Sequence, residues 1–217
     1  MKRKAHLGRP PGATSKATTA RIVAAARVCF ARTGYAGTTN QQIADHAGIS
    51  TAAIYQYFDS KTELYLATVR DANEEILPHY RRAAAEATSL RGALRAVLTA
   101  SARLHALDPS LTAFLSALPV EMQRHEELSR AMKGPSEIVE IFSDIVDGGV
   151  RSGEISATLA PRLLLLFVAC TMGMSLFAAS IDGTQLSAIA DSFSDLLDGT
   201  LFSSGRKARK AKRRGRR

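Results

Sequence analysis

Residues 39–58 read TNQQIADHAGISTAAIYQYF, and this stretch predicts two short helices joined by a tight turn. Thr39 and Gln42 form a Thr-x-x-Gln capping box, which marks the start of the first helix. Gly48 tolerates the positive φ that the turn requires, and Ser50 is a typical N-cap for the second helix. Two short helices with a glycine-containing turn form a helix-turn-helix unit, whose second helix lies in the major groove of DNA.

The exposed side of the predicted second helix carries no acidic residue, so it does not repel DNA phosphates. Gln56 has the amide needed to pair with an adenine edge, while Thr51 and Ala52 suit contacts with thymine methyl groups. Hydroxyl groups on the same side suit phosphate oxygens. Lys61, in the first turn of the following helix, adds positive charge to an N-terminus directed at phosphate. The DNA-binding residues predicted for this region are Thr39, Asn40, Gln41, Ser50, Thr51, Ala52, Tyr55, Gln56, Tyr57 and Lys61.

The formal net charge of +9 is concentrated at the two ends of the chain. Residues 1–17 contain five Lys or Arg and no acid, and residues 206–217 contain nine Lys or Arg and no acid. Residues 66–205, by contrast, hold seventeen acids against eleven bases. This distribution indicates that the ends meet a polyanion and that the body does not. Arg9 fits either an arm in the DNA minor groove or an unstructured leader, and both interpretations stay open.

The remaining sequence shows helical spacing and no alternating strand pattern of useful length. A first helix is predicted to begin at Thr18 as its N-cap and to end at Gly34. Stripes of apolar residues at i, i+3 and i+4 spacing predict further helices that start near Leu94, Ile138 and Leu186. Composition predicts four segments: a flexible basic arm over residues 1–17, a helix-turn-helix domain over 18–65, a helical body over 66–204 and a disordered basic tail over 205–217.

The segment from Leu163 to Ile181 has 19 residues without a charge, which as a helix is about the thickness of a bilayer core. A membrane span is therefore one interpretation. Its interspersed Thr, Gly and Ser residues and the lack of flanking aromatic belts favour the other, a helix buried inside the protein or in a subunit interface.

No pattern in the sequence indicates an enzyme or a cofactor site. The five histidines show no metal-ligand spacing, no serine sits in a nucleophile-elbow pattern, and no glycine-rich phosphate loop is present. Cys29 and Cys170 lie apart in apolar runs, as expected of thiols in a reduced compartment. After the basic start, Gly8 to Gly12 replace the apolar stretch of a secretion signal, so we expect a cytoplasmic, nucleoid-associated protein.

Residues 18–69 resemble the TetR family of transcriptional regulators. The motifs that carry the resemblance are IVAAA at 22–26, Phe30, Gly34-Tyr35, Ile43-Ala44, AGIS at 47–50 and IYQYFDSKTEL at 54–64. The chain departs from the usual pattern at Gln56, where His is common, at Asp59, and in carrying the basic tail.

The resemblance implies an all-α protein of about nine helices. Three helices form the DNA-binding head, a fourth links it to a larger ligand-sensing body, and the last two pack into the four-helix bundle of a homodimer. In this chain those two would be residues 161–180 and 184–202. The implied dimer interface contains Gly173, Ser175, Ile189, Phe193 and Leu197.

An effector cavity is implied by the resemblance alone. Met and aromatic side chains at helical spacing are candidates to line it, although the same spacing is typical of ordinary core. The candidates are Phe114, Met122, Met172, Met174 and Phe177.

The sequence thus predicts a homodimeric repressor that binds a double-stranded DNA operator, responds to a small molecule, and uses neither a cofactor nor a membrane. Two other hypotheses stay open: a sequence-independent nucleoid or RNA-associated protein that binds through its basic ends, and a protein tethered to a membrane by residues 163–181.

Deleting residues 206–217 should flatten the salt dependence of DNA binding. The deletion removes nine positive charges and lowers the formal net charge to zero, and each phosphate contact contributes about 0.9 to the log–log salt slope. Affinity for random duplex should fall while preference for a specific site survives, since a flexible basic segment contacts charge and not base edges. Salt titrations of both proteins on one duplex provide the measurement; superimposable slopes would exclude the tail from DNA binding.

Overall fold

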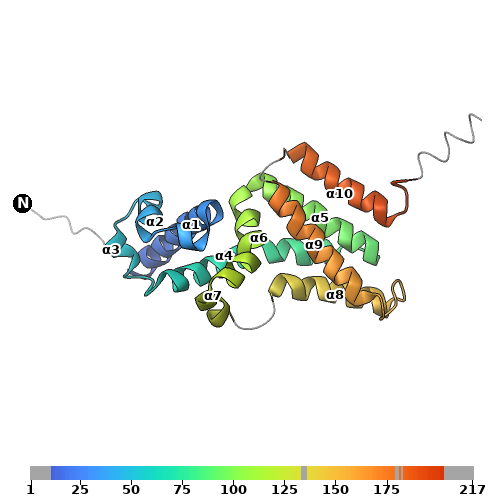
Figure 1. Cartoon of the computed structure of the whole chain (residues 1–217), viewed down its shortest axis with the longest axis horizontal. Helices are drawn as coiled ribbons and strands as arrows, with labels where there is room; N and C mark the ends of the chain where they lie inside the picture. Colours follow the sequence, from blue (N-terminus) through green and yellow to red (C-terminus); the bar gives the residue numbers. More distant parts are fainter. Residues whose placement is uncertain (1–10, 133–135, 179–180, 182, 203–217) are drawn as a thin grey trace, which may run out of the picture. The chain divides into compact units, whose positions relative to one another are not determined.

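The computed structural model describes residues 11–132, 136–178, 181 and 183–202 (Figure 1). Arg9 and the basic tail lie outside the described residues. Over the described part the chain is entirely helical, with ten helices and no strand, which confirms the all-α prediction. The helices are α1 (Pro11–Gly37), α2 (Asn40–Ala47), α3 (Thr51–Ile54), α4 (Lys61–Ala85), α5 (Leu90–Leu107), α6 (Pro109–Arg124), α7 (Glu126–Ala131), α8 (Glu137–Arg151), α9 (Ala160–Ala178) and α10 (Gly183–Leu197).

Backbone contacts group the chain into two compact units, of which the structure describes the parts given above. The head unit comprises residues 1–72 and 117–133, and the body unit comprises residues 73–116 and 134–217. The boundaries fall inside α4 and α6. Residues 117–133, which the sequence analysis assigned to the body, therefore belong by contact to the head unit; the domain boundaries at 65 and 204 stay a prediction.

In the head unit, α1 starts earlier than predicted. Thr18 lies inside the helix and is not its N-cap, because helical structure already begins at Pro11. The neighbouring Thr19 hydroxyl donates to the Ser15 carbonyl at 3.1 Å, a back-bond that threonine makes within helices. Gly34 has φ 71° and ψ 178°, so the regular part of α1 stops there as predicted.

The core of the head unit is aromatic. Phe30 and Tyr65 meet edge to face with ring centroids 4.8 Å apart, and Tyr35 and Tyr65 do so at 5.3 Å. All three side chains are buried. Edge-to-face pairs of this kind add about 0.5–1.5 kcal/mol each beyond their buried area, so α4 is held firmly against the end of α1.

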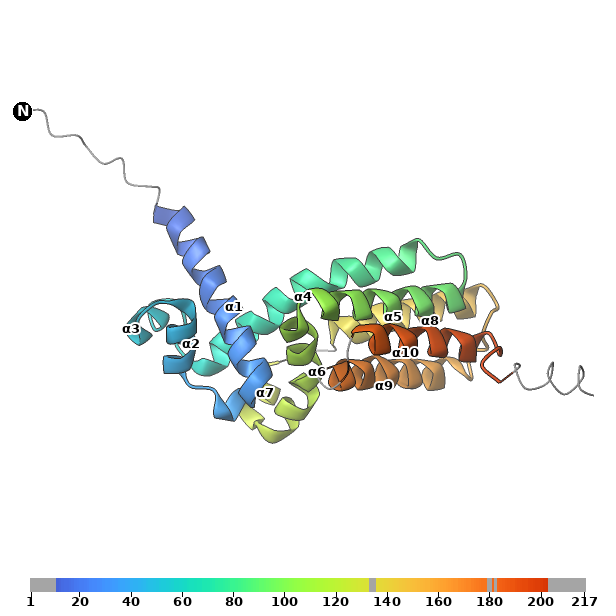
Figure 2. The same cartoon turned by 90° about the horizontal axis from the view of Figure 1, so that it is seen from above.

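In the body unit, α5 packs against α8, α9 and α10 (Figures 1 and 2). The predicted stripe that starts at Leu94 is buried along α5. Phe142 of α8 and Phe167 of α9 pack at 4.7 Å, and a Cβ placed on Gly149 would lie 2.5 Å from Leu90. Gly149 is therefore what allows α8 to approach α5 this closely.

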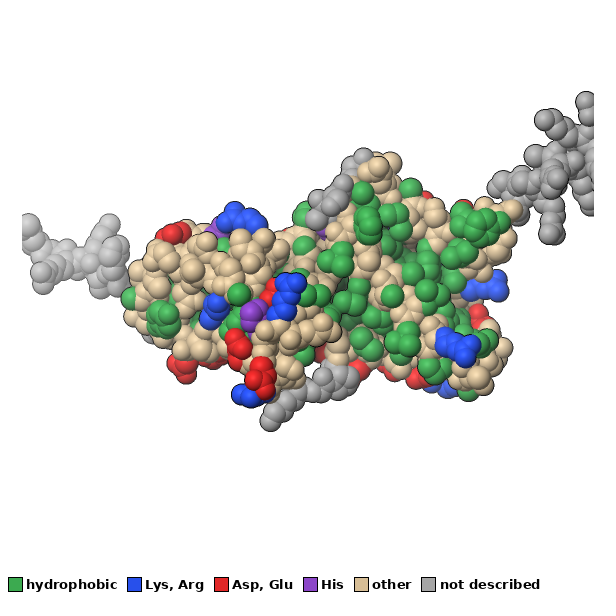
Figure 3. Space-filling model, in the orientation of Figure 1, with side chains coloured by type: hydrophobic (Ala, Val, Ile, Leu, Met, Phe, Trp, Pro, Cys, Tyr) green, Lys and Arg blue, Asp and Glu red, His purple; other side chains and the backbone are tan. Residues whose placement is uncertain are grey.

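The described residues leave the outer face of α9 uncovered. Within the described residues, α9 is the one helix whose length and composition would let it cross a membrane, a property that core helices also show, and only 22% of its apolar window is buried. The expectation of burial inside the protein is thus not met by the single chain. Figure 3 shows hydrophobic side chains gathered over α9 and α10 with few charges among them. The large exposed members from these two helices are Leu165, Leu166, Leu176, Phe177, Ile189 and Leu196.

Candidate DNA-binding site

The predicted capping box begins α2. Thr39 is extended, with φ −108° and ψ 153°; its hydroxyl accepts from the N–H of Gln42 at 3.2 Å, while its own N–H donates to Gln42 Oε1 at 2.8 Å. Gly48 closes the helix in the left-handed region, with φ 65° and ψ 42°. Both ends of α2 are therefore determined by local chemistry, as the sequence indicated.

The second helix is shorter than its sequence suggested. Ser50 caps α3 by accepting from the N–H of Ala53 at 3.2 Å, but α3 itself spans only Thr51–Ile54. The chain then continues in tight turns, in which the N–H of Gln56 donates to the carbonyl of Ala53 at 3.2 Å. Gln56 consequently projects from the turn after the helix.

Small and buried side chains join the two helices. Ile43 and Ala44 of α2 are 0% exposed and Ile54 of α3 is 1% exposed. Outside this core, Arg21 of α1 donates to the carbonyl of Ala47 at 2.5 Å, beside the turn at Gly48. Sequence reasoning missed Arg21, because an arginine on the outer side of an amphipathic helix gives no signal of which carbonyl it reaches.

The structure brings two predicted DNA-binding residues together across the pair of helices. The Thr51 hydroxyl donates to Gln41 Oε1 at 2.6 Å, and Gln41 Nε2 donates to Asp45 at 2.7 Å. The Thr51 hydroxyl is therefore engaged inside the motif, and its methyl group is the part suited to a base contact.

The other predicted residues differ in exposure. Ser50 and Thr39 act as helix caps and are exposed, Asn40 is half-buried, and Tyr57 is half-buried. The residues that form an open, acid-free face are Ala52, Tyr55 and Gln56, with Tyr55 56% exposed.

Lys61 has a role in the structure that the sequence did not predict. Its Nζ donates to the carbonyls of Tyr35 at 2.9 Å and Thr38 at 3.2 Å, and it lies 4.4 Å from the centre of the Tyr35 ring. The ammonium group thus pairs with the orphan carbonyls at the end of α1. Its predicted phosphate contact stays a prediction, and its internal contacts make it a support for the motif.

Sequence reasoning also missed Glu121 of α6. This buried carboxylate accepts from the N–H of Tyr35 at 3.3 Å, and His125 Nε2 lies 3.3 Å from the same oxygen. Burial, with the nearby charge of Glu121, raises the pKa of Tyr65, so its phenol stays protonated. Because 86 residues separate Tyr35 from Glu121, no local pattern could have indicated the contact.

The five candidate effector residues are divided between the two units. Met122 belongs to the head unit and the other four to the body unit. Of those four, Phe114 and Met174 are buried, Met172 is half-buried, and Phe177 is 66% exposed. The candidate set therefore stays a prediction.

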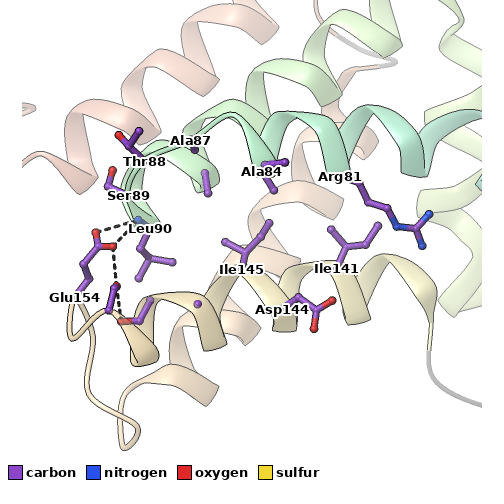
Figure 4. A pocket seen from close by; sticks show the side chains of 15 residues that line it. Arg81, Ala84, Ala87, Thr88, Ser89, Leu90, Ile141, Asp144, Ile145 and Glu154 are labelled. Carbon is purple, nitrogen blue, oxygen red and sulfur yellow. Dashed lines mark hydrogen bonds between the residues drawn. The ribbon is translucent and has the colours of Figure 1, made fainter.

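A groove of about 500 Å³ lies elsewhere in the body unit, and none of these five residues lines it. Figure 4 shows Ala84 of α4 facing Ile141 and Ile145 of α8 across it, with Arg81 at one end. Glu154, at the other end, accepts from the N–H of Leu90 at 3.0 and 2.9 Å and so caps α5. The groove is mostly apolar, and the charged residues of its lining are Arg81, Asp144 and Glu154.

Among the described residues, no group of three or more His, Cys, Asp or Glu side chains could hold a metal ion. Cys29 and Cys170 are free thiols, and burial raises the pKa of each, which disfavours the reactive thiolate.

Comparisons with known proteins agree with this geometry. Residues 22–68 match the family model described as bacterial regulatory proteins, tetR family. The chain is 25% identical over 143 residues to the HTH-type transcriptional repressor KstR2 of Rhodococcus jostii, covering 66% of this chain and 70% of that protein. It is 26% identical over 192 residues to the HTH-type transcriptional regulator RutR of Escherichia coli, covering 83% of this chain and 85% of that protein.

Solved structures share the fold. The transcriptional regulator FadR from Bacillus subtilis, crystallised in complex with stearoyl-CoA, aligns with a TM-score of 0.66 at 20% identity, over 83% of this chain and 98% of that one. The matched family region contains the whole of α2 and α3 with their caps.

Replacing Gln56 with Ala should weaken binding to a specific duplex by about 1–3 kcal/mol and leave random duplex unaffected. The side chain is exposed beyond α3 and carries the amide that pairs with adenine. Gln42→Ala is unsuitable as a control because it breaks the α2 cap, so Gln123→Ala, at an exposed position on α6, provides it. Equal losses on both duplexes would contradict base contact by Gln56.

Proposed function

Because this chain belongs to the TetR family of bacterial regulatory proteins, we propose that it is a homodimeric repressor of transcription that leaves its operator when a small molecule binds the body unit. It acts in the cytoplasm on double-stranded DNA and catalyses no reaction. Among its relatives, KstR2 is a repressor by name and FasR of Mycolicibacterium smegmatis is an activator by name, so repression is part of the proposal and is tested by the response of the bound promoter.

The observation that carries the proposal is the exposed, acid-free face of Ala52, Tyr55 and Gln56 on a helix pair with both helices capped. A plain helical hairpin in a core would bury that face. The alternative is a protein that binds nucleic acid independently of sequence through its basic ends alone. That alternative does not explain why this face is exposed and free of acidic residues. Enrichment of one sequence from a random duplex pool by the purified protein tests the proposal, and binding without enrichment would favour the alternative.

The apolar outer face of α9 and α10 supports the homodimer. Exposed apolar patches of this kind mark interaction sites, and a two-fold dimer would present two equivalent reading helices to a palindromic operator. A Cβ placed on Gly173 would meet nothing within 4 Å, and Ile189 is 38% exposed, so both of these predicted interface residues lie where a second copy has access. The same face would serve a membrane-tethered protein, which makes association in solution the deciding property.

Leu165→Glu should convert the dimer to monomer, because the new carboxylate would be buried without a partner at the interface. Leu165 is 71% exposed in the single chain, so folding itself should be unaffected. Leu107→Glu is the matched control, since Leu107 is 83% exposed and belongs to α5, outside the two helices of the proposed interface. Sedimentation velocity at micromolar concentration provides the measurement. A monomeric wild-type protein would contradict the assignment.

We place the effector in the groove between α4, α5 and α8. Its apolar walls suit an apolar body, and Arg81 at its end suits a carboxylate or phosphate, since a guanidinium binds such groups in a bidentate manner. Stearoyl-CoA, the ligand in the FadR crystal, combines an acyl chain with phosphates and is therefore a suitable first probe.

Ala84→Leu should weaken stearoyl-CoA binding about tenfold or more, because the larger side chain fills the groove between α4 and α8. Ala83→Leu makes the same change one residue earlier, at a position that does not line the groove. Titration of ligand into protein bound to labelled duplex should release DNA from wild type and Ala83→Leu at lower ligand concentration than from Ala84→Leu. Equal release from all three would exclude this groove as the effector site.

A further inference from the structure

We propose that Glu121 of α6 is a positioning residue for DNA recognition. Its buried carboxylate holds the backbone of Tyr35 at the corner between α1 and α2, so operator binding depends on a side chain from outside the helix-turn-helix. The inference rests on the proposed function, and every contact that carries it lies within the head unit.

The contact is a close one. Glu121 is 9% exposed and its Oε2 accepts from the N–H of Tyr35 at 3.3 Å. A Cβ placed on Gly34 would lie 2.7 Å from Oε1, so the absence of a side chain at Gly34 makes room for the carboxylate. The Nε2 of His125, one turn along the chain, lies 3.3 Å from Oε2, and its ring lies tilted against the Tyr35 ring with the centroids 5.0 Å apart.

Opposite charges act on the two polar groups of the Tyr35 backbone. The N–H faces the Glu121 carboxylate, and the C=O accepts from the Lys61 ammonium at 2.9 Å. Hydrogen bonds to charged groups are stronger than neutral ones, and the Tyr35 hydroxyl is bonded as well, to Thr62 Oγ1 at 2.8 Å. Tyr35 is therefore held at its N–H, its carbonyl and its hydroxyl.

Hydrogen bonds and the intervening backbone connect this corner to α3 and to the exposed face of Ala52, Tyr55 and Gln56. The Thr38 hydroxyl donates to the carbonyl of Gly34 at 2.7 Å, and the next residue, Thr39, caps α2. From α2, Gln41 accepts from Thr51 on α3. The orientation of α3 thus depends on the direction in which the chain leaves α1. Glu121 contributes to that direction through its hydrogen bond with the N–H of Tyr35.

Space filling alone does not account for a carboxylate at this position. A buried carboxylate loses hydration that its hydrogen bonds must replace, whereas methionine would fill a similar volume without that cost. What the carboxylate adds is a directed acceptor for one particular N–H. Removing the acceptor should lower the fraction of molecules in the DNA-competent geometry, and the apparent affinity falls in proportion to that fraction.

The test compares two neutral replacements. Glu121→Met removes the acceptor, whereas Glu121→Gln keeps an acceptor oxygen and gives the protein the same net charge as Glu121→Met does. Glu127→Gln removes the same charge from an exposed position on α7 and is the electrostatic control. Each protein is titrated on the duplex enriched by the wild type from a random pool and on a random duplex. Amide hydrogen exchange at Tyr35 is followed in parallel.

We expect Glu121→Met to bind the enriched duplex at least tenfold more weakly than wild type, which corresponds to about 1.4 kcal/mol, with little change on random duplex. Glu121→Gln should stay within about threefold, and Glu127→Gln should match or exceed wild-type affinity, because losing a negative charge favours DNA binding. Tyr35 amide exchange should accelerate in Glu121→Met and less in Glu121→Gln.

A folded Glu121→Met that binds the enriched duplex as wild type does, or that loses equally on both duplexes, would overturn the proposal. If Glu121→Met does not fold, Glu121→Ala, which also removes the acceptor, takes its place: accelerated exchange of the Tyr35 amide supports the contact, and wild-type protection overturns it. If the wild type enriches no sequence at all, the proposed function fails first, an outcome separate from any difference between the variants.

Discussion

The head unit depends on how the chain is held where α1 ends. Gly34 takes a φ of 71° that other residues rarely adopt, and this turns the backbone toward α2. Immediately after it, Tyr35 is bonded through its N–H to Glu121, through its carbonyl to Lys61 and through its hydroxyl to Thr62. Without these contacts the turn would leave unpaired backbone groups at a buried helix end, which is costly.

The short helices that follow depend on their caps and on tertiary packing. A helix of four residues is far below the length at which helices are stable alone in water, so α3 persists because Ser50 caps it and Ile54 is buried beneath it. Short helices of this kind act as rigid supports only when both ends are bonded. The hydrogen bond from Thr51 to Gln41 adds a direct connection between the two helices, so the exposed residues of α3 are presented in one orientation.

The body unit has a different constraint, which is the burial of its apolar surface. Phe142 and Phe167 pack inside it, but Leu165 and Phe177 of α9 are more than half exposed. A helix that is apolar all round needs a covering on every side, and the described part of the chain leaves much of α9 exposed. The uncovered face is therefore the strongest physical argument for a second copy, and it explains why a helix with the composition of a membrane span occurs in a DNA-binding protein.

The sequence alone determined the local features of this protein. The all-α class follows from the helical spacing of apolar residues, and the turn that ends α2 follows from the positive φ that Gly48 tolerates. The starts of α2 and α3 follow from Thr39 and Ser50, whose side chains bond backbone groups three residues along the chain. The early start of α1 was missed because Thr18 can cap a helix or lie inside one.

Only the tertiary structure decided that Thr51 bonds to Gln41, that Lys61 donates to the carbonyl of Tyr35, and that Glu121, 86 positions along the chain, accepts from the N–H of Tyr35. Such contacts depend on how helices meet in space, and since side-chain spacing indicates only which face of a helix is apolar, the partner of each polar group is set by packing.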